Sequence, residues 1–303
     1  MEGALIRPDR PRLGVAFGGG TARGLAHIGA LKVLESEGAQ PSAVAGTSYG
    51  AIIAALYALG MPALELERLV REQNTGEVWL QGLDFGLHRG SLIHGRRLAR
   101  WLDRKFFQGA TFGDVQIPLV VACTDLATGK LVVIDDGPIS LAVQASCALP
   151  GLFAPVRTNG RVLIDGGFVE TVPFRALQTL QPELVIGLHA GLDVNNSRII
   201  LGIRRFNASR TGRRFQRLAT RLRPVGPFGQ IVRGMAVWVR SYSRALRAPH
   251  GGLLVHEEPP AAWWDFHKSP QAIVAGERAM RQALEGAPEF ARRLQVAEVP
   301  CDD

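Results

Sequence analysis

The stretch LGVAFGGGTARGLAHIGALKVLESEGAQPSAVAGTSYG, residues 13–50, decides the fold class. Its apolar start, Leu13–Phe17, ends at three glycines, which is typical of a buried strand that enters a tight loop. Helical spacing of apolar residues follows over Gly24–Glu37, and a second short strand is expected at Ala43–Ala45. Ala51–Leu59, just beyond, is apolar on all sides, as in a buried helix. Strands that alternate with helices predict an α/β domain with a mainly parallel sheet.

The same alternation continues along the chain. Further strands are expected at 118–125, 130–135, 161–164 and 184–188, and further helices at 63–73, 95–107, 139–145, 174–180 and 271–284. We therefore expect residues 12–190 to form the core of one domain. In this prediction residues 191–303, a basic helical region and the C-terminal helices, complete the same domain.

Composition excludes several classes of protein. With 303 residues, 47% hydrophobic and 20% charged, the chain is too apolar for a disordered protein. Its three cysteines form no CxxC pair, so they lack the spacing of a zinc site and favour a reducing compartment. Residues 1–13 have no apolar stretch of a secretory signal, and the uncharged runs 51–64 and 137–156 are too short or are broken by proline. We expect a soluble, cytoplasmic protein, and no metal or organic cofactor is implied.

Residues 46–50, Gly46-Thr47-Ser48-Tyr49-Gly50, form a GxSxG motif between a predicted strand and a predicted helix. A nucleophile elbow needs this context, because a sharp turn lifts the serine hydroxyl above the sheet and small neighbours let the turn close. The N–H groups at the start of the following helix would face a developing oxyanion. The alternative is a serine that only caps the helix.

The three glycines Gly18, Gly19 and Gly20 predict a loop whose backbone N–H groups face one concavity, as in an oxyanion hole. A dinucleotide fingerprint fits poorly, because Arg23 stands where its third glycine would be and residues 42–45 contain no acid. A phosphate-binding Walker loop would need Lys-Ser/Thr, which is absent here. The alternative to an oxyanion hole is a purely structural turn.

A serine nucleophile needs a base, and the sequence alone leaves its identity open. A triad in the order of α/β-hydrolases could combine Ser48 with Asp125 or Asp165 and with His189 or His256. That fold normally has several strands before its elbow, however, and here only one predicted helix separates the glycine loop from Ser48. The histidines are His27, His88, His94, His189, His250, His256 and His267, and His27 is expected only to pack or cap.

Four motifs together resemble the patatin-like phospholipases, and most closely the short bacterial members related to the catalytic domain of neuropathy target esterase. They are GGGTARG at 18–24, the GxSxG at 46–50, ASCALPGLFAPV at 145–156 and Asp165-Gly166-Gly167, in the family's order and spacing. The resemblance covers about residues 12–190. It implies a three-layer α/β/α fold with a mainly parallel central sheet, here with a basic helical C-terminal extension.

The resemblance also implies a Ser–Asp dyad without a catalytic histidine. Ser48 matches the family's nucleophile, Asp165 its general base, and the backbone of Gly18, Gly19 and Gly20 its oxyanion hole. Thr21 is a departure, because many members have a further glycine there and a Cβ restricts the loop. Supporting roles fall on Arg23, Tyr49, Gly46, Gly50, Gly166 and Gly167.

A basic block follows the predicted core. Between Val194 and His256 the chain has thirteen arginines and no lysine, aspartate or glutamate. Within residues 213–247 the arginines alternate with apolar positions at helical spacing, which predicts basic amphipathic helices that bind an anionic membrane surface. The alternatives are a helix pair that packs on the core and, less favoured because no known motif accompanies the charge, a nucleic-acid surface.

These observations predict a serine acyl hydrolase that cleaves carboxylic esters of lipids, of the phospholipase or lysophospholipase type, peripheral to the inner face of the membrane. The residues themselves support an ester hydrolase with a serine nucleophile, and the resemblance supplies the lipid class. Two alternatives stay open: a non-catalytic or regulatory protein with the same fold, and an acyltransferase.

Overall fold

A computed structural model describes residues 11–72, 85–88, 91–93, 95–191, 246–260 and 268–295. Side chains are not described for residues 85–93, Arg96 and Leu98. Residues 1–190 and 247–303 cluster into one compact unit, and residues 191–246 form a second. The basic segment 213–247 therefore lies almost entirely outside the described residues, and the predictions made for it stay predictions.

A central sheet of eight strands has the order β10-β9-β1-β2-β5-β8-β7, with β6 also paired to β5. Its strands are β1 (Leu13–Phe17), β2 (Ala43–Thr47), β5 (Leu119–Asp125), β6 (Leu131–Ile134), β7 (Val156–Thr158), β8 (Arg161–Asp165), β9 (Leu184–His189) and β10 (Leu253–His256). Pairing is parallel from β10 to β5 and antiparallel for β6, β7 and β8. The predicted, mainly parallel sheet is confirmed, with an antiparallel part at one edge.

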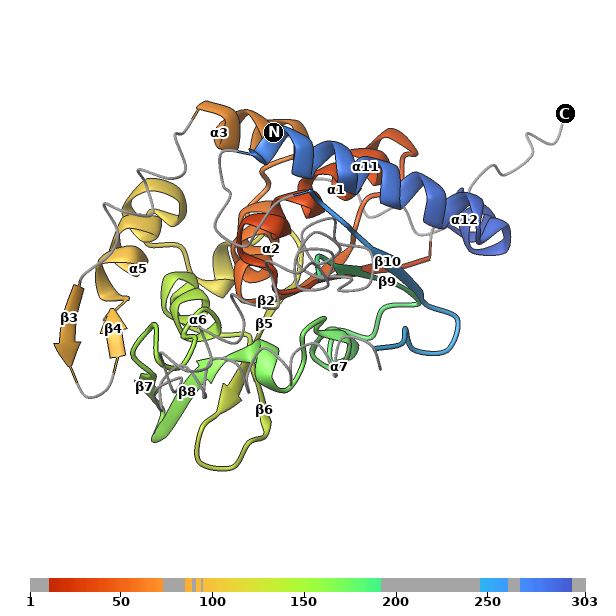
Figure 1. The fold of residues 1–303 in the computed structure, drawn as a ribbon. Coiled ribbons are helices and arrows are strands. Elements are labelled where there is room, and N and C mark those ends of the chain that lie inside the picture. The colour runs from red at the N-terminus through yellow and green to blue at the C-terminus, as the bar shows by residue number, and fades with distance from the viewer. Residues whose placement is uncertain are drawn as a thin grey trace, which may run out of the picture. The chain divides into compact units, whose positions relative to one another are not determined.

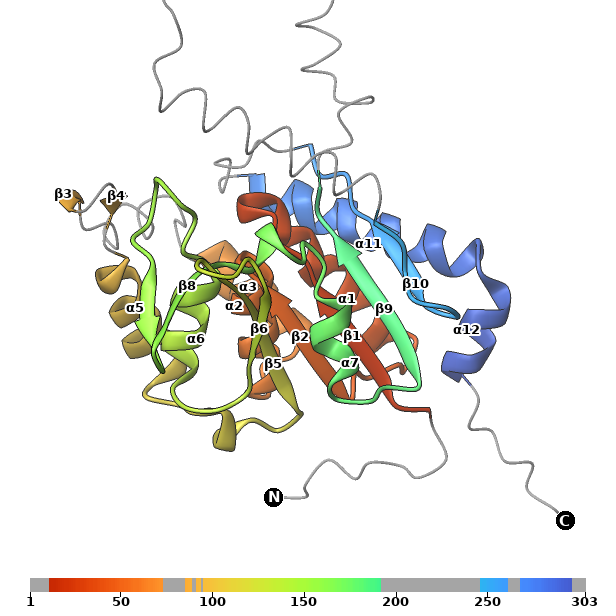
Figure 2. The same cartoon turned by 90° about the horizontal axis from the view of Figure 1, so that it is seen from below.

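Helices cover both faces of this sheet, which confirms the three layers (Figures 1 and 2). One layer contains α1 (Ala26–Ser36), α2 (Tyr49–Ala58), α3 (Ala63–Glu72), α5 (Arg96–Leu102), α6 (Ile139–Ser146) and α11 (Ser269–Glu285). On the opposite face α7 (Phe174–Gln178) packs against β1, β2 and β5. A small hairpin, β3 (Phe85–His88) and β4 (Ser91–Ile93), stands apart from the main sheet (Figure 1).

The C-terminal helix α11 packs against α1, which lies near the N-terminus. Helix α11 crosses α1 so closely that a Cβ on Gly29 would overlap the carbonyl of Ile273, and one on Gly276 would overlap that of Ala26. Lys32 of α1 is also ion-paired with Glu277 of α11. Helix α12 (Pro288–Gln295) follows and buries Phe290 and Leu294. The first and last helices thus form one continuous layer.

Candidate active site

Ser48 lies on the turn between β2 and α2, the strand–turn–helix context that its motif predicts. Its backbone has φ 54° and ψ −126°, a left-handed conformation that is strained for a serine. Both glycines of the motif are needed for space: a Cβ on Gly46 would overlap the backbone of Ala51, and one on Gly50 would overlap the carbonyls of Phe17 and Gly18. The sharp turn therefore presents the Ser48 side chain at the end of β2.

Ser146, at the end of α6, holds this turn in place. Its fully buried hydroxyl accepts a hydrogen bond from the Ser48 N–H at 2.8 Å and donates one to the Ala122 carbonyl at 2.7 Å. The Thr47 hydroxyl adds a bond of 3.0 Å to the Glu170 carbonyl. Sequence analysis did not assign a role to Ser146, although it lies in the ASCALPGLFAPV motif.

Asp165 ends β8 and is buried, with 6% of its surface exposed. Its carboxylate accepts a hydrogen bond from the Gly167 N–H at 2.8 Å and lies close enough to the Ser48 side chain for that side chain to lower its pKa. Burial raises the pKa of Asp165 from 3.8 to about 6, although these two neighbours lower it. A carboxylate with a pKa close to neutrality, in contact with a hydroxyl, is able to accept its proton.

Glycines let the loop after Asp165 pack closely on neighbouring strands. A Cβ on Gly166 would overlap the Ala122 carbonyl, and one on Gly167 would lie 3.1 Å from the Asp165 carboxylate. The Thr124 hydroxyl donates to the main-chain carbonyl of Asp165 at 2.9 Å. The predicted supporting glycines therefore act by giving the carboxylate room and a backbone donor.

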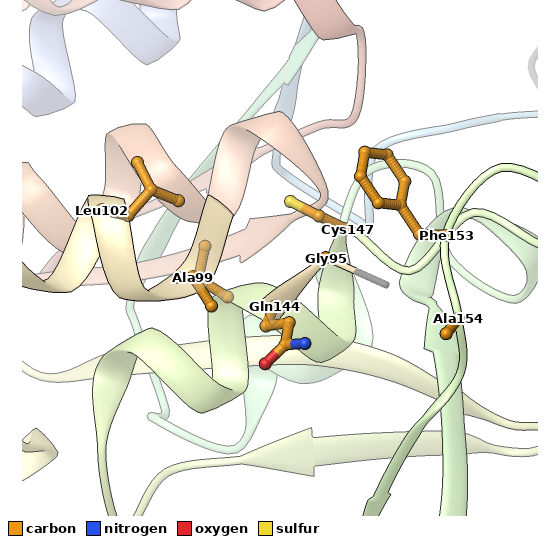
Figure 3. A pocket seen from close by; sticks show the side chains of 8 residues that line it. Gly95, Ala99, Leu102, Gln144, Cys147, Phe153 and Ala154 are labelled. Carbon is orange, nitrogen blue, oxygen red and sulfur yellow. The ribbon is translucent and has the colours of Figure 1, made fainter. Parts of the chain in front are cut away.

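Cys147, directly after α6, is a second partner of the nucleophile. Its thiol lies close to the Ser48 side chain, and burial together with the nearby Asp165 carboxylate raises its pKa above the ordinary value, so the thiol stays neutral. On its other side Cys147 lines a pocket between α5 and α6 (Figure 3). Ala99, Leu102, Val143, Phe153 and Ala154 supply most of the remaining, apolar lining. The cavity between these side chains is small, about 10 Å³.

The glycine loop approaches Ser48, but two of its predicted donors are already used. A Cβ on Gly19 would lie 3.4 Å from the Ser48 Cβ. The Gly18 N–H donates to the Leu188 carbonyl at 2.9 Å, and the Gly19 N–H donates to the Thr171 carbonyl at 3.0 Å. Both N–H groups are therefore engaged with main-chain carbonyls here, and their role in an oxyanion hole stays a prediction. Gly20 remains, since its N–H has no hydrogen-bond acceptor among the described residues.

Thr21 has φ 50°, the left-handed region that glycine enters without strain and a β-branched residue does not. We expect Thr21→Gly to raise the free energy of unfolding by up to about 1 kcal/mol, because relief of strain outweighs the greater freedom of the unfolded chain. Urea denaturation measures the difference. Thr158→Gly, in β7 with ordinary strand geometry, is the control and should destabilise. A Thr21→Gly protein less stable than wild type would contradict the strain.

Arg23 and Tyr49 lie beside the loop and are largely buried. The Nε and Nη1 atoms of Arg23 are inaccessible to solvent and have no hydrogen-bond partner in the described part of the chain. Burial lowers the pKa of Arg23 from 12.5 to about 10, so the side chain is still a cation at neutral pH. The Tyr49 ring packs where Gly24 leaves room, since a Cβ on Gly24 would lie 2.8 Å from it. Both predicted supporting residues thus lie next to the glycine loop.

The histidines that are described do not complete a triad. His189 and His256 face each other, with 3.3 Å between their Nδ1 atoms, and burial followed by the charges of His256, Arg23 and His27 lowers the pKa of His189 to about 3. Asp165 and Cys147 are described side chains close enough to Ser48 for it to influence their pKa, and His189 and His256 instead face each other. His27 does more than pack or cap: its ring is bonded to the Gly18 carbonyl and to Glu257.

Comparison with known proteins identifies the family of the chain. The family model described as patatin-like phospholipase matches residues 15–177, which is more than half of the chain. The chain belongs to the patatin-like phospholipase family. This patatin-like protein is 31% identical over 182 residues to NTE family protein Rv1063c of Mycobacterium tuberculosis, a match that covers 59% of the chain and 49% of the relative.

Two further matches, one to a curated protein and one to a solved structure, differ more from this chain in length or in sequence. Lysophospholipase nte1 of Emericella nidulans is 30% identical over 186 residues, which is 59% of the chain but 12% of the relative. The patatin-like protein therefore matches less than half of the length of Rv1063c and of lysophospholipase nte1. The solved structure of VipD from Legionella pneumophila superposes with a TM-score of 0.48 at 16% identity, over 92% of this chain and 67% of that one.

The described residues contain neither a helix that could cross a membrane nor a cluster of metal-binding side chains. None of their helices combines the length and the apolar character that crossing a bilayer requires. Within the same residues, no cluster of three or more His, Cys, Asp or Glu side chains has the arrangement of a metal site.

Proposed function

We propose that this patatin-like protein is a serine hydrolase of lipid acyl esters that uses a Ser48–Asp165 dyad. The contact of the Ser48 hydroxyl with a buried carboxylate whose pKa is about 6 carries the proposal. Asp165 takes the hydroxyl proton while Ser48 Oγ attacks the ester carbonyl, and the alcohol leaves with that proton. Asp165 then takes a proton from water, whose oxygen attacks the acyl-enzyme. The fatty acid is released as Asp165 returns that proton to Ser48 Oγ.

The oxyanion of each tetrahedral intermediate needs hydrogen-bond donors near Ser48. In the proposed arrangement the donors are the N–H of Gly20 and that of Thr21, because those of Gly18 and Gly19 are engaged. The described residues provide no acceptor for the Gly20 and Thr21 N–H groups. An oxyanion hole one residue further along the loop than predicted follows from this backbone pairing.

A lipid acyl chain suits the surroundings of the nucleophile. The apolar pocket in Figure 3 includes Cys147, which lies close to the Ser48 side chain, so an acyl group on Ser48 would have its first carbons near the pocket. The family membership supports a phospholipase, and the relative named a lysophospholipase supports the same class of ester.

Labelling with a fluorophosphonate and hydrolysis of an ester panel test the function. We expect Ser48 to be phosphonylated, and acyl esters and lysophospholipids to be hydrolysed with loss of activity in Ser48→Ala. Absence of labelling in the folded wild-type protein would favour a non-catalytic member of the fold. Transfer of the acyl group to an added alcohol in preference to water would favour an acyltransferase.

Filling the pocket should change chain-length preference. Ala99→Leu adds carbon atoms to the lining, and we expect kcat/KM for a decanoate ester to fall about tenfold while that for acetate stays within about twofold, since each buried methylene is worth roughly a factor of four. Ala291→Leu is the control. It makes the same change in α12, at a residue that does not line this pocket. Equal loss on acetate and decanoate would place the acyl chain elsewhere.

A further inference from the structure

The His27 ring is hydrogen-bonded at both nitrogens. Its Nε2 lies 2.8 Å from the Gly18 carbonyl oxygen and its Nδ1 lies 2.5 Å from Glu257 Oε2, and both side chains are fully buried. A carbonyl only accepts, so Nε2 donates, and an ionised carboxylate on the other side requires Nδ1 to donate as well. Burial opposes the positive charge, but Glu257 and the Gly18 carbonyl outweigh it and raise the pKa of His27. The His27 ring therefore connects Glu257 to the Gly18 carbonyl.

This pair fixes one peptide group of the glycine loop. The peptide between Gly18 and Gly19 has its oxygen bonded to His27 and its N–H bonded to the Thr171 carbonyl. Rotation of that peptide would turn the next one, which carries the Gly20 N–H. Gly19 itself lies against Ser48. The direction of the proposed oxyanion donor therefore depends on the bond from His27.

Glu257 comes from a remote part of the chain. It directly follows β10, and its N–H donates to the His189 carbonyl at 2.9 Å, next to the β9–β10 pairing. Glu257 lies 230 residues after His27 and well beyond the residues 15–177 that the family model matches. Its second oxygen, Oε1, is buried and has no hydrogen-bond partner among the described residues, so His27 supplies its hydrogen-bonding counter-charge.

We infer that His27 and Glu257 are positioning residues that hold the glycine loop in its catalytic conformation, and that β10 is thereby part of the catalytic machinery. The catalytic half of this role rests on the proposed function. The other charged or titratable groups near His27 are Arg23, His189 and His256. In the described part of the chain, the side chain hydrogen-bonded to the Gly18 carbonyl is that of His27. A residue that only fills the core would affect stability and leave turnover per folded molecule unchanged.

The test compares two substitutions of His27 that differ in reach. His27→Asn keeps an amide near the Nδ1 position but cannot reach the Gly18 carbonyl, whereas His27→Gln places an amide near Nε2. We expect His27→Asn to lower kcat at least tenfold, per active site titrated with fluorophosphonate, and to leave KM within about twofold, since loss of one oxyanion donor lowers kcat about 10²–10³-fold. His27→Gln should recover most of that loss.

Glu257→Gln tests the contribution of β10, and Glu277→Gln is its matched control. Glu277 pairs with Lys32 of the same helix α1 but not with the loop, and Lys32 keeps Glu67 at 2.7 Å when Glu277 is neutral. We expect Glu257→Gln to lower kcat and to be non-additive with His27→Asn, while Glu277→Gln keeps wild-type kcat. A kcat within twofold of wild type in both His27→Asn and Glu257→Gln would overturn the inference.

Amide hydrogen exchange at residues 18–21 provides a readout that needs no substrate. We expect faster exchange in His27→Asn and Glu257→Gln and unchanged exchange in Glu277→Gln. If wild type neither hydrolyses esters nor reacts with fluorophosphonate, the proposed function fails, and exchange still shows whether the pair holds the loop. Exchange at wild-type rates in both variants would refute the positioning role.

Discussion

Asp165→Asn should abolish most hydrolysis and at the same time stabilise the protein at neutral pH. Loss of the general base is expected to lower kcat by 10²–10⁴, because Asn cannot accept the Ser48 proton. The Asn side chain keeps an oxygen for the Gly167 N–H but removes a buried charge. Since burial raises the pKa of Asp165 to about 6, ionisation of this group in the folded protein is unfavourable.

The sign of the stability effect follows from that pKa. A carboxyl group with a raised pKa in the folded state contributes stability below its unfolded pKa of 3.8, and this contribution is lost as the pH rises through about 6. The Asn variant has no ionisable group at this position, so its free energy of unfolding has no corresponding decrease over that pH range. We therefore expect it to gain stability over wild type between pH 4 and 6, up to about 3 kcal/mol at pH 7.

Urea denaturation at pH 4 and pH 7, beside ester hydrolysis, measures both effects. Wild-type kcat/KM should also fall about tenfold per unit below pH 6, as Asp165 becomes protonated. Ser48→Ala serves as the control, because it removes activity and leaves the Asp165 charge in place. An Asn variant that keeps near-normal turnover would point to a different base.

Ser146→Ala should damage both stability and turnover. The substitution leaves the Ser48 N–H and the Ala122 carbonyl without their partner in a fully buried place. A buried group that loses its hydrogen bond costs about 1–3 kcal/mol, so we expect a loss of about 2–4 kcal/mol in the free energy of unfolding. The strained Ser48 backbone should also relax, with a fall in kcat of at least tenfold.

Denaturation and active-site titration separate the two consequences of Ser146→Ala. Ser36→Ala is a matched control, since the Ser36 hydroxyl also donates to a carbonyl, that of Val33, but near the surface at the end of α1. It should lose less than about 1 kcal/mol and keep full turnover. Wild-type kcat per titrated site in Ser146→Ala would mean that Gly46 and Gly50 hold the elbow without help.

Local sequence predicted the strand–turn–helix context of Ser48, the proposed nucleophile, because the strand, the tight turn and the helix are adjacent in the chain. Ser48 was found in this way, and the layered, mainly parallel sheet followed from the alternation of strands with helices. Asp165 was assigned from the family resemblance, and the sequence alone left Asp125 and the histidines open. The pairing of Asp165 with Ser48 needs β8 to lie beside β5, which no local pattern specifies.

The backbone bonds of the glycine loop and the contacts of His27 could not be predicted for one physical reason, because both depend on long-range pairing. Whether a glycine N–H is free depends on the carbonyls of Leu188 and Thr171, which lie more than 150 residues later. A lone histidine on an apolar helix face also carries no signal of its carboxylate partner when that partner is Glu257. The positive φ of Thr21, by contrast, agrees with the departure that the motif itself revealed.

The crossing of α1 and α11 has a consequence for biosynthesis. Ribosomes add residues at roughly 5–20 per second, so the face of α1 around Gly29 emerges on the order of ten seconds or more before α11 is available to cover it. During that interval a glycine-lined, apolar surface is open to unwanted partners. Nascent chains of this protein should therefore engage chaperones until the last helices leave the exit tunnel.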